Sequence, residues 1–297
     1  MVNKGKQGMS KTTKQVLREL VNARNGLVVP GAFNAMSARI IVDQGFKAVY
    51  LTGAGFTNMQ YGLPDLAMMG LRDIADCAAR IRDAVDVPLI VDGDTGFGNA
   101  VNVWNTVRSL EAAGADAIQL EDQTFPKRCG HFAGKDVAPL EEMLAKIRAA
   151  TDARRDDDFL IIARTDARAT LGFDAAIERA RRFAEAGADV LFVEAVESLD
   201  EIKQLPKLLQ QPQLVNIVIG GKTPTLAAAE LGELGFGIVL YANAALQGAV
   251  AGMQRALGML ARDGRLDEDP AIVAPFSERQ RLVNKSLFDE LERRYAS

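Results

Sequence analysis

The stretch EAAGADAIQLED (residues 111–122) contains the pattern that decides the fold class. A helical segment ends in small residues, Gly114 suits the C-cap of that helix, and an apolar run follows at once. The same order of features recurs in DQGFKAVYLT (43–52), EAGADVLFVEA (185–195) and ELGFGIVLYA (233–242). The repeat therefore predicts a chain built from successive helix and strand units.

Short runs rich in Val, Ile and Leu continue this pattern in both directions from that stretch. They cover residues 27–29, 48–51, 88–91, 117–120, 159–163, 190–193, 214–219 and 238–241. Eight strands that alternate with helices indicate a parallel sheet. They predict an α/β fold, a closed (β/α)8 barrel of the TIM type, with a doubly wound open sheet as the alternative.

The length of 297 residues fits one such barrel, and no interdomain linker is apparent. We expect a flexible tail over residues 1–13 and a single barrel domain, with a C-terminal helical extension, over residues 14–297. Residues 277–295 carry apolar side chains at helical spacing. They predict a last helix that needs another surface to pack against.

Composition excludes several classes of protein. The hydrophobic fraction of 48% and charged fraction of 25% are typical of a globular chain, and a net charge of -4 with mixed signs offers no basic patch for nucleic acid or membranes. Two cysteines do not form a disulfide framework and fit a reducing compartment. With no apolar stretch of about 18 residues, we expect a cytoplasmic protein.

Polar and acidic residues follow the predicted strands, at the barrel end where such enzymes hold their active sites. They are Asp92, Asp94, Glu121, Asp122, Arg164, Thr165, Asp166, Glu194 and Asn216. Asp92 and Asp94 would share one face of an extended chain. Grouped carboxylates repel unless a cation neutralises them, and oxygen ligands favour a hard ion such as Mg2+. For any single acid, a helix cap or an ion pair with Arg164 or Arg168 is the alternative.

The segment FPKRCGHFAGK (residues 125–135) after the fourth strand holds the single histidine and one of the two cysteines. Its glycines permit a loop that moves, and Lys127, Arg128 and His131 would stabilise a thiolate at Cys129 or orient its thiol. Cys77 lies in a helical pattern and is better interpreted as a small buried hydrophobe. The loop therefore marks Cys129 as a candidate for catalysis.

Five motifs together resemble one known family. DGDTGFGNA (92–100), LEDQTFPKRCGH (120–131), IIARTDAR (161–168), FVEA (192–195) and GGKTP (220–224) occur in the order found in the isocitrate lyase and phosphoenolpyruvate mutase superfamily. The resemblance runs from about residue 14 to the C-terminus. Within the family the chain is similar to the short enzymes 2-methylisocitrate lyase, 2,3-dimethylmalate lyase, the petal death protein and carboxyphosphonoenolpyruvate phosphonomutase.

The resemblance implies a metal site and a substrate site. Asp92 would bind Mg2+ directly, with Mn2+ as a possible substitute, while Asp65, Asp94 and Glu121 would hold its water shell. The residues expected to contact substrate are Thr52, Gly53 and Ala54 as a backbone cradle, Arg164, Glu194 and Asn216 toward the distal part, and Gly130 and His131 on the loop. Lys127 and Cys129 would lie on a gating loop, with Cys129 as the acid.

The family also implies a homotetramer in which the C-terminal helix is exchanged between subunits. Two departures from the family pattern stand out. Gly93 replaces Ala in the metal motif, which we expect only to loosen the turn. Ile219 replaces a Glu that several relatives carry, which favours a small or alkylated malate over a tricarboxylate such as methylisocitrate.

The favoured hypothesis is a Mg2+-dependent retro-aldol lyase that cleaves a 2-hydroxy di- or tricarboxylate, of the substituted malate or methylisocitrate type, into a 2-oxo acid and a carboxylate. Arg164 would support the developing enolate and Cys129 would protonate it, while the base stays open between Asp65 and a hydroxide on the metal. The alternatives are a phosphonomutase that forms a P–C bond, an oxaloacetate decarboxylase, and a barrel without catalysis. A barrel without catalysis should have lost residues that contact the metal or the substrate. This chain keeps them, namely Asp92, Asp94, Glu121, Lys127, Cys129 and Arg164.

Overall fold

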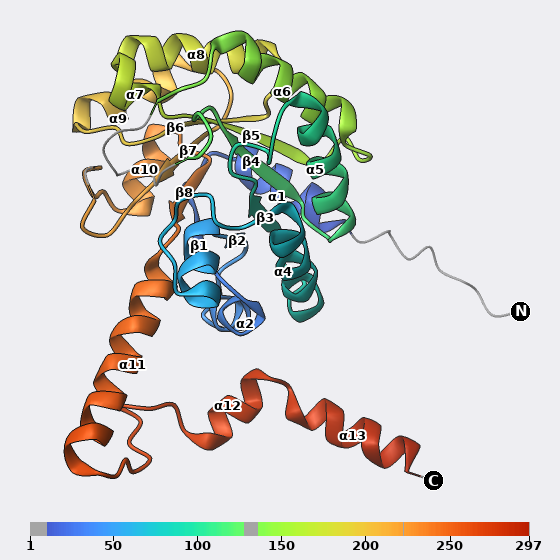
Figure 1. The fold of residues 1–297 in the computed structure, drawn as a ribbon, viewed down its shortest axis with the longest axis vertical. Helices are drawn as coiled ribbons and strands as arrows, with labels where there is room; N and C mark the ends of the chain where they lie inside the picture. The colour runs from blue at the N-terminus through green and yellow to red at the C-terminus, as the bar shows by residue number, and fades with distance from the viewer. Residues whose placement is uncertain (1–10, 128–135, 222, 297) are drawn as a thin grey trace, which may run out of the picture.

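The computed structural model describes residues 11–127, 136–221 and 223–296, and in it eight parallel strands close into a barrel in chain order (Figure 1). The strands are β1 Leu27–Ala32, β2 Val49–Leu51, β3 Leu89–Asp92, β4 Ala117–Glu121, β5 Leu160–Thr165, β6 Val190–Val193, β7 Gln213–Asn216 and β8 Ile238–Tyr241. Pairing of β1 with β8, Leu27 opposite Ile238, closes the ring. The predicted TIM-type barrel is confirmed, and the open sheet is excluded.

The helices of the described residues cover the outside and the amino end of the barrel, and the last three form an arm that extends away from it (Figure 1). The helices are α1 Thr13–Asn22, α2 Ala35–Asp43, α3 Gly53–Phe56, the π-helical turn η1 Thr57–Tyr61, α4 Leu71–Ala84, α5 Ala100–Ala112, α6 Leu140–Ala153, α7 Ala167–Leu171, α8 Phe173–Glu185, α9 Leu199–Leu208, α10 Ala228–Leu234, α11 Ala244–Asp263, α12 Phe276–Leu282 and α13 Lys285–Tyr295. No helix of the described residues is long and apolar enough to cross a membrane.

Strand β7 is shorter at its carboxyl end than the apolar run 214–219 predicts. It ends at Asn216, and residues 218–221 form a turn in which the Gly221 N–H donates to the Val218 carbonyl at 2.8 Å. Gly220 has a φ of 80°, which a strand does not accommodate. The chain therefore turns at residues 218–221, inside and just beyond the apolar run that predicted a longer strand.

The interior of the barrel is filled by every second residue of each strand. Val29, Ile90, Ile162 and their equivalents form one buried cluster inside the ring. Leu17 and Val21 of α1 belong to this cluster and are almost fully buried. Helix α1 therefore closes the amino end of the barrel and leaves the carboxyl end for a site.

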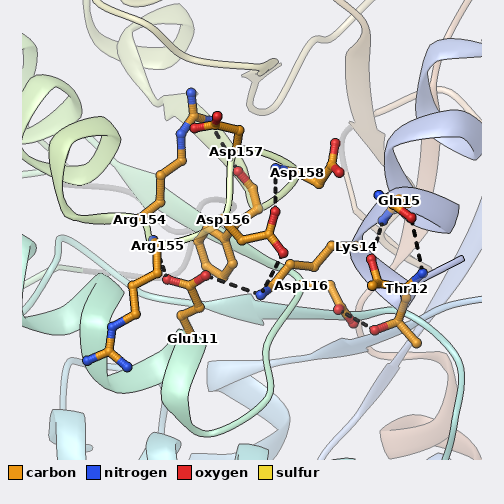
Figure 2. Close-up of polar contacts among 12 residues, drawn as sticks. Thr12, Lys14, Gln15, Glu111, Asp116, Arg154, Arg155, Asp156, Asp157 and Asp158 are labelled. Carbon is orange, nitrogen blue, oxygen red and sulfur yellow. Dashed lines mark hydrogen bonds and ion pairs between the residues drawn. The ribbon is translucent and has the colours of Figure 1, made fainter.

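A polar network joins α1 to the amino end of the barrel (Figure 2). Thr13 donates to Asp116 at 2.5 Å. Lys14 lies between two acids, 3.1 Å from Glu111 and 3.3 Å from Asp156. Thr12 caps α1 and Thr13 belongs to the helix, at the end of the stretch expected as a tail, whereas residues 1–10 lie outside the described residues.

The C-terminal segment differs from the predicted single helix over 277–295. It forms α12 and α13, which are separated at Asn284, whose φ is 54°. Asparagine tolerates this left-handed conformation, so the helix breaks although the apolar spacing continues. Arg281 of α12 pairs with Asp43 of α2 at 2.7 Å, while α11 and α13 run away from the barrel (Figure 1).

Candidate active site

A small cavity of about 50 Å³ opens at the carboxyl end of the barrel. Its lining consists of Tyr50, Thr52, Ala54, Asp65, Asp92, Gln119, Lys127, Arg164, Phe192, Glu194, Asn216, Val218, Leu240, Ala242 and Asn243. These residues come from the carboxyl-terminal parts of the strands and from the segments that follow them. The structure thus brings residues that are widely separated in the sequence into one site.

Asp92 is the last residue of β3 and is held by donors from three segments. Its carboxylate accepts from the N–H of Gly53 at 3.2 Å, from the N–H of Asp94 at 3.1 Å and from the amide of Gln119 at 3.5 Å. A Cβ at Gly53 would lie 3.1 Å from the carboxylate and 2.7 Å from the methyl group of Met69. Glycine therefore favours this close approach, and the Gly53 N–H is directed at Asp92.

Asp94 does not continue the strand that Asp92 ends. Its φ is 46°, so the chain turns away and the two carboxylates are not related by an extended backbone. A Cβ at the intervening Gly93 would lie 2.9 Å from the Gln119 carbonyl and 2.8 Å from Ile118. The glycine thus permits tight packing of β3 on β4, rather than loosening the turn as expected.

Lys127 extends from the segment after β4 and is almost completely buried. Its ammonium lies 2.5 Å from Asp65 and 2.9 Å from Asp94. Burial alone would lower the pKa of Lys127, but Asp94, Glu121 and Asp65 raise it, so the side chain stays charged. Burial raises the pKa of Asp94 to about 7, with Lys127 opposing the shift. The ammonium group of Lys127 thus forms ion pairs with two acids on separate loops, Asp65 and Asp94.

Arg164 of β5 is held between two carboxylates. It pairs with Glu121 at 3.1 Å, its direct neighbour in the strand register, and with Asp166 at 2.9 Å. Its guanidinium also lies over the ring of Phe192, 5.3 Å from the centroid. Burial would lower the pKa of Arg164, but the acids raise it well above its usual value. The side chain is therefore a fixed cation facing the cavity.

Glu121 combines deep burial with incomplete pairing. One carboxylate oxygen pairs with Arg164, while Oε1 has no hydrogen-bond partner among the described residues. Burial raises the pKa of Glu121 well above its ordinary value. Within the described part of the chain, no three acidic, His or Cys side chains already converge as a metal cluster.

Among the described residues, the distal part of the cavity carries no charged side chain apart from Glu194. Asn216 and Asn243 contribute amides, with Val218 and Leu240 beside them. Ile219, expected to bear on this region, is 54% exposed and does not line the cavity. Its neighbour Val218 takes that place.

Some acids after the strands have structural partners instead. Asp122 is buried, accepting from Arg179 at 2.8 Å and from Thr165 at 2.7 Å. For this residue the ion-pair alternative describes the structure better than a metal role. Cys77 is buried, as expected, and burial raises the pKa of its thiol to about 11. The predicted site residues Cys129, Gly130 and His131 lie outside the described residues.

Sequence reasoning missed seven of the cavity residues: Tyr50, Gln119, Phe192 and Asn243, and the apolar Val218, Leu240 and Ala242. The first three lie two positions before Thr52, Glu121 and Glu194, so they share the inward face one layer deeper. A polar Tyr50 and Gln119 inside apolar runs were the available signal. Asn243 lies two residues after the end of β8, where no strand-end residue was considered.

The family model described as phosphoenolpyruvate phosphomutase matches residues 17–261. A 2,3-dimethylmalate lyase of Eubacterium barkeri is 42% identical over 285 residues, covering 96% of this chain and 99% of the relative. This chain belongs to the phosphoenolpyruvate mutase and isocitrate lyase superfamily. It is an enzyme whose homologues in the superfamily include carbon–carbon lyases.

Other superfamily members extend the similarity. A 2-methylisocitrate lyase of Aeropyrum pernix is 47% identical, covering 76% of this chain and 72% of the relative. A carboxyvinyl-carboxyphosphonate phosphorylmutase of Arabidopsis thaliana is 38% identical, covering 94% of this chain and 83% of the relative. Lyases and a phosphonomutase thus both occur among the relatives.

Solved structures of the superfamily share the whole fold. The crystal structure of 2,3-dimethylmalate lyase has a TM-score of 0.89 at 35% identity and covers 96% of each chain. Phosphonopyruvate hydrolase, solved with oxalate and Mg++, has a TM-score of 0.85 at 33% identity, covering 97% of this chain and 100% of the neighbour. A structural neighbour therefore holds Mg2+ together with a small dicarboxylate.

Proposed function

We propose that the enzyme cleaves the C2–C3 bond of an alkylated 2-hydroxy dicarboxylate in a Mg2+-dependent retro-aldol reaction. The observation that carries the proposal is the cavity itself, whose lining brings together Asp92, the Lys127–Asp65 pair and the fixed Arg164. Acids and a rigid cation in one buried site suit a ligand with both a metal-chelating end and an anionic end. The lyase relatives support the same reaction class.

The donor set fits a hydrated Mg2+ held directly by Asp92. Mg2+ keeps several waters and needs only one or two carboxylates, so no cluster of three acids is required. The buried Oε1 of Glu121, which lacks a partner among the described residues, suits a water of that shell, as do Asp65 and Asp94. When bound, the ion supplies Lewis-acid polarisation of the oxygens that chelate it.

The protein side chains supply orientation and charge for the reaction. Arg164, clamped by Glu121 and Asp166, would hold the departing carboxylate as negative charge develops on it. The backbone over residues 52–54 would hold the other carboxylate at the Ala54 side, since the Gly53 N–H is directed at Asp92. We propose Cys129 as the donor of the proton to carbon, on the loop beyond Lys127.

Charge around the cavity favours a dicarboxylate. Lys127 and Arg164 are the cations of the described lining, opposed by Asp65, Asp92 and Glu194. Among the residues that the structure describes, the distal amides and Val218 offer no further cation for a third carboxylate. A methyl-substituted malate therefore matches the cavity better than a tricarboxylate.

A substrate panel with Mg2+ tests the function. For 2,3-dimethylmalate, scission of C2–C3 gives pyruvate and propionate, and the hydroxyl proton balances the proton added to carbon. We expect alkylated malates to release a 2-oxo acid faster than 2-methylisocitrate does. The rate is measured by coupling release to reduction of the 2-oxo acid. Chelation with EDTA should abolish release, and Mg2+ or Mn2+ should restore it. Full turnover after exhaustive chelation would contradict the metal assignment.

A phosphonomutase reaction is the second candidate, favoured by the phosphorylmutase relative at 38% identity. The same site would hold a 2-oxo acid enolate during transfer. Phosphorus NMR of an incubation with carboxyphosphonoenolpyruvate or phosphoenolpyruvate, in which phosphorus is bonded to the enol oxygen, distinguishes the two reactions. A new P–C resonance without C–C cleavage of any malate would replace the lyase proposal.

We also propose a cytoplasmic homotetramer in which the C-terminal helices are exchanged between subunits. Supporting it, the arm formed by α11, α12 and α13 exposes large apolar side chains. They are Val250, Met253, Leu257, Leu260, Phe276, Val283, Leu287 and Phe288. Light scattering should give about four chain masses, and deletion from Ser277 should cause aggregation. A monomer at micromolar concentration would contradict this assembly.

A further inference from the structure

Three polar side chains form a chain of hydrogen bonds across the floor of the cavity. The Tyr50 hydroxyl lies 2.6 Å from Oε1 of Gln119, and the Gln119 amide nitrogen lies 3.5 Å from Oδ1 of Asp92. Tyr50 and Gln119 are both nearly fully buried, and all three line the cavity. The chain therefore connects the proposed metal ligand to a hydroxyl group at the floor.

The direction of each hydrogen bond in this chain follows from the chemistry of its members. An ionised carboxylate only accepts, so Gln119 presents its NH2 group to Asp92 and its carbonyl oxygen to Tyr50. The reverse amide orientation would place two acceptors against each other. The N–H groups of Gly53 and Asp94 hold Asp92 in place from other sides. Tyr50 must consequently donate its single proton to Gln119.

We propose that Gln119 is a positioning residue that fixes the hydroxyl direction of Tyr50, so that Tyr50 presents only a lone pair to the ligand. A ligand with a hydroxyl group at this point donates to Tyr50. A ligand with a carbonyl oxygen there meets a second acceptor and gains no bond. The site thereby selects 2-hydroxy carboxylates over 2-oxo carboxylates.

This inference rests on the proposed function, because it assumes that a 2-substituted carboxylate binds in the cavity. The inference adds that the site distinguishes a hydroxyl from a carbonyl group at C2 of the ligand. It assigns this selectivity to Tyr50 and Gln119, which are neither proposed metal ligands nor the proposed acid. In a retro-aldol reaction the hydroxyl substrate would be retained and the 2-oxo product released more readily. Neither Tyr50 nor Gln119 reacts covalently in this account.

The test compares lactate with pyruvate, which differ only at C2, by calorimetric titration in the presence of saturating Mg2+. The measured quantity is the ratio of the pyruvate Kd to the Kd of the tighter lactate enantiomer. Dividing by the wild-type ratio removes the intrinsic difference in metal chelation. Tyr50→Phe and Gln119→Met should each lower the ratio by about tenfold, the size of one lost hydrogen bond against an unsatisfied acceptor.

Two further variants separate positioning from general damage. Gln119→Glu keeps an acceptor for Tyr50, so it should retain the wild-type ratio even if Mn2+ affinity, followed by electron paramagnetic resonance, changes. Gln213→Met is the matched control, because Gln213 is a buried strand glutamine of β7 that does not line the cavity. The folded Gln213→Met variant should keep the wild-type ratio of the pyruvate Kd to the lactate Kd, even if its stability is lower.

An unchanged ratio in both folded variants, Tyr50→Phe and Gln119→Met, would overturn the inference. Loss of the ratio in Gln119→Glu would overturn it as well, since the Tyr50 acceptor remains. The binding ratio does not require turnover. A protein that shows the expected ratios but cleaves no malate would remove the lyase proposal and leave this one standing.

Discussion

The two ends of the barrel both bury acidic side chains, yet they satisfy them differently. At the amino end, Asp116 accepts from Thr13 at 2.5 Å, from Arg82 at 3.1 Å and from the Leu89 N–H at 2.8 Å. At the carboxyl end, Glu121 has an oxygen without a partner among the described residues. The protein satisfies Asp116 at one end by itself and leaves an oxygen of Glu121 for a ligand at the other.

The largest effect should follow from Asp92→Ala at the carboxyl end. Loss of the direct metal carboxylate should lower kcat/KM by about 10²- to 10³-fold, because a preorganised electrostatic group is removed. The protein should remain folded, since a residue at the mouth contributes little to the core. Mn2+ titration and circular dichroism check both parts. An active variant with unchanged Mn2+ affinity would break the assignment of this end to the metal.

Leu17→Ala should show the opposite profile at the amino end. Leu17 is fully buried between α1 and the barrel interior, so truncation should cost about 3 kcal/mol of unfolding free energy. Urea denaturation gives the free energy, and kcat with Mg2+ gives the activity. We expect kcat to stay within about twofold at temperatures where the variant is folded. A large loss of kcat in folded protein would show that the two ends are coupled.

A matched pair of isosteric substitutions sharpens the contrast. Asp116→Asn places an NH2 group against donors and should cost about 2 kcal/mol of stability with activity unchanged. Glu121→Gln keeps an acceptor for Arg164 and should lower activity or metal affinity by about 10- to 100-fold. Its melting temperature should not fall, because a buried carboxylate is neutralised. Equal losses of stability in both variants would contradict the division between the ends.

The smallest effect concerns pH at the amino end, where Figure 2 shows Asp156 beside Lys14. The hydrogen bond from the Asp158 N–H, opposed by slight burial and aided by Lys14, lowers the pKa of Asp156 below its usual value near 3.8. A lowered pKa adds stability above the unfolded value, and this is lost as pH falls through the folded value. Asp156→Asn should therefore melt below wild type at pH 6, with the difference vanishing toward pH 3. A constant difference would exclude the charge effect.

Much of the fold could be predicted because each strand has a recognisable pattern in its own short stretch of sequence. Short apolar runs after a C-cap glycine, such as Gly114 before β4, need no knowledge of distant residues. The break between α12 and α13 could not be predicted, since helical spacing of apolar residues continues across it. Only the left-handed conformation of Asn284 ends the helix there.

The candidate site was predictable at the strand ends and less so below them. Asp92, Arg164 and Asn216 were found because parallel strands deliver their last residues to one mouth. Tyr50 and Gln119 were missed, because they lie within apolar runs that were interpreted as core. The contact of Lys127 with Asp65 joins two loops 62 residues apart, and local patterns do not encode such a contact.

Closure of the ring by β1 and β8 has a consequence for synthesis of the chain. Leu27 of β1 pairs with Ile238 of β8, so about 200 further residues must be synthesised before the second neighbour of β1, strand β8, leaves the ribosome. At roughly 5–20 residues per second, that interval is on the order of 10–40 s. Throughout it, β1 has a free edge and Leu17 lacks most of its packing. Nascent chains halted before residue 238 should therefore bind chaperones, and release should restore the closed ring within seconds.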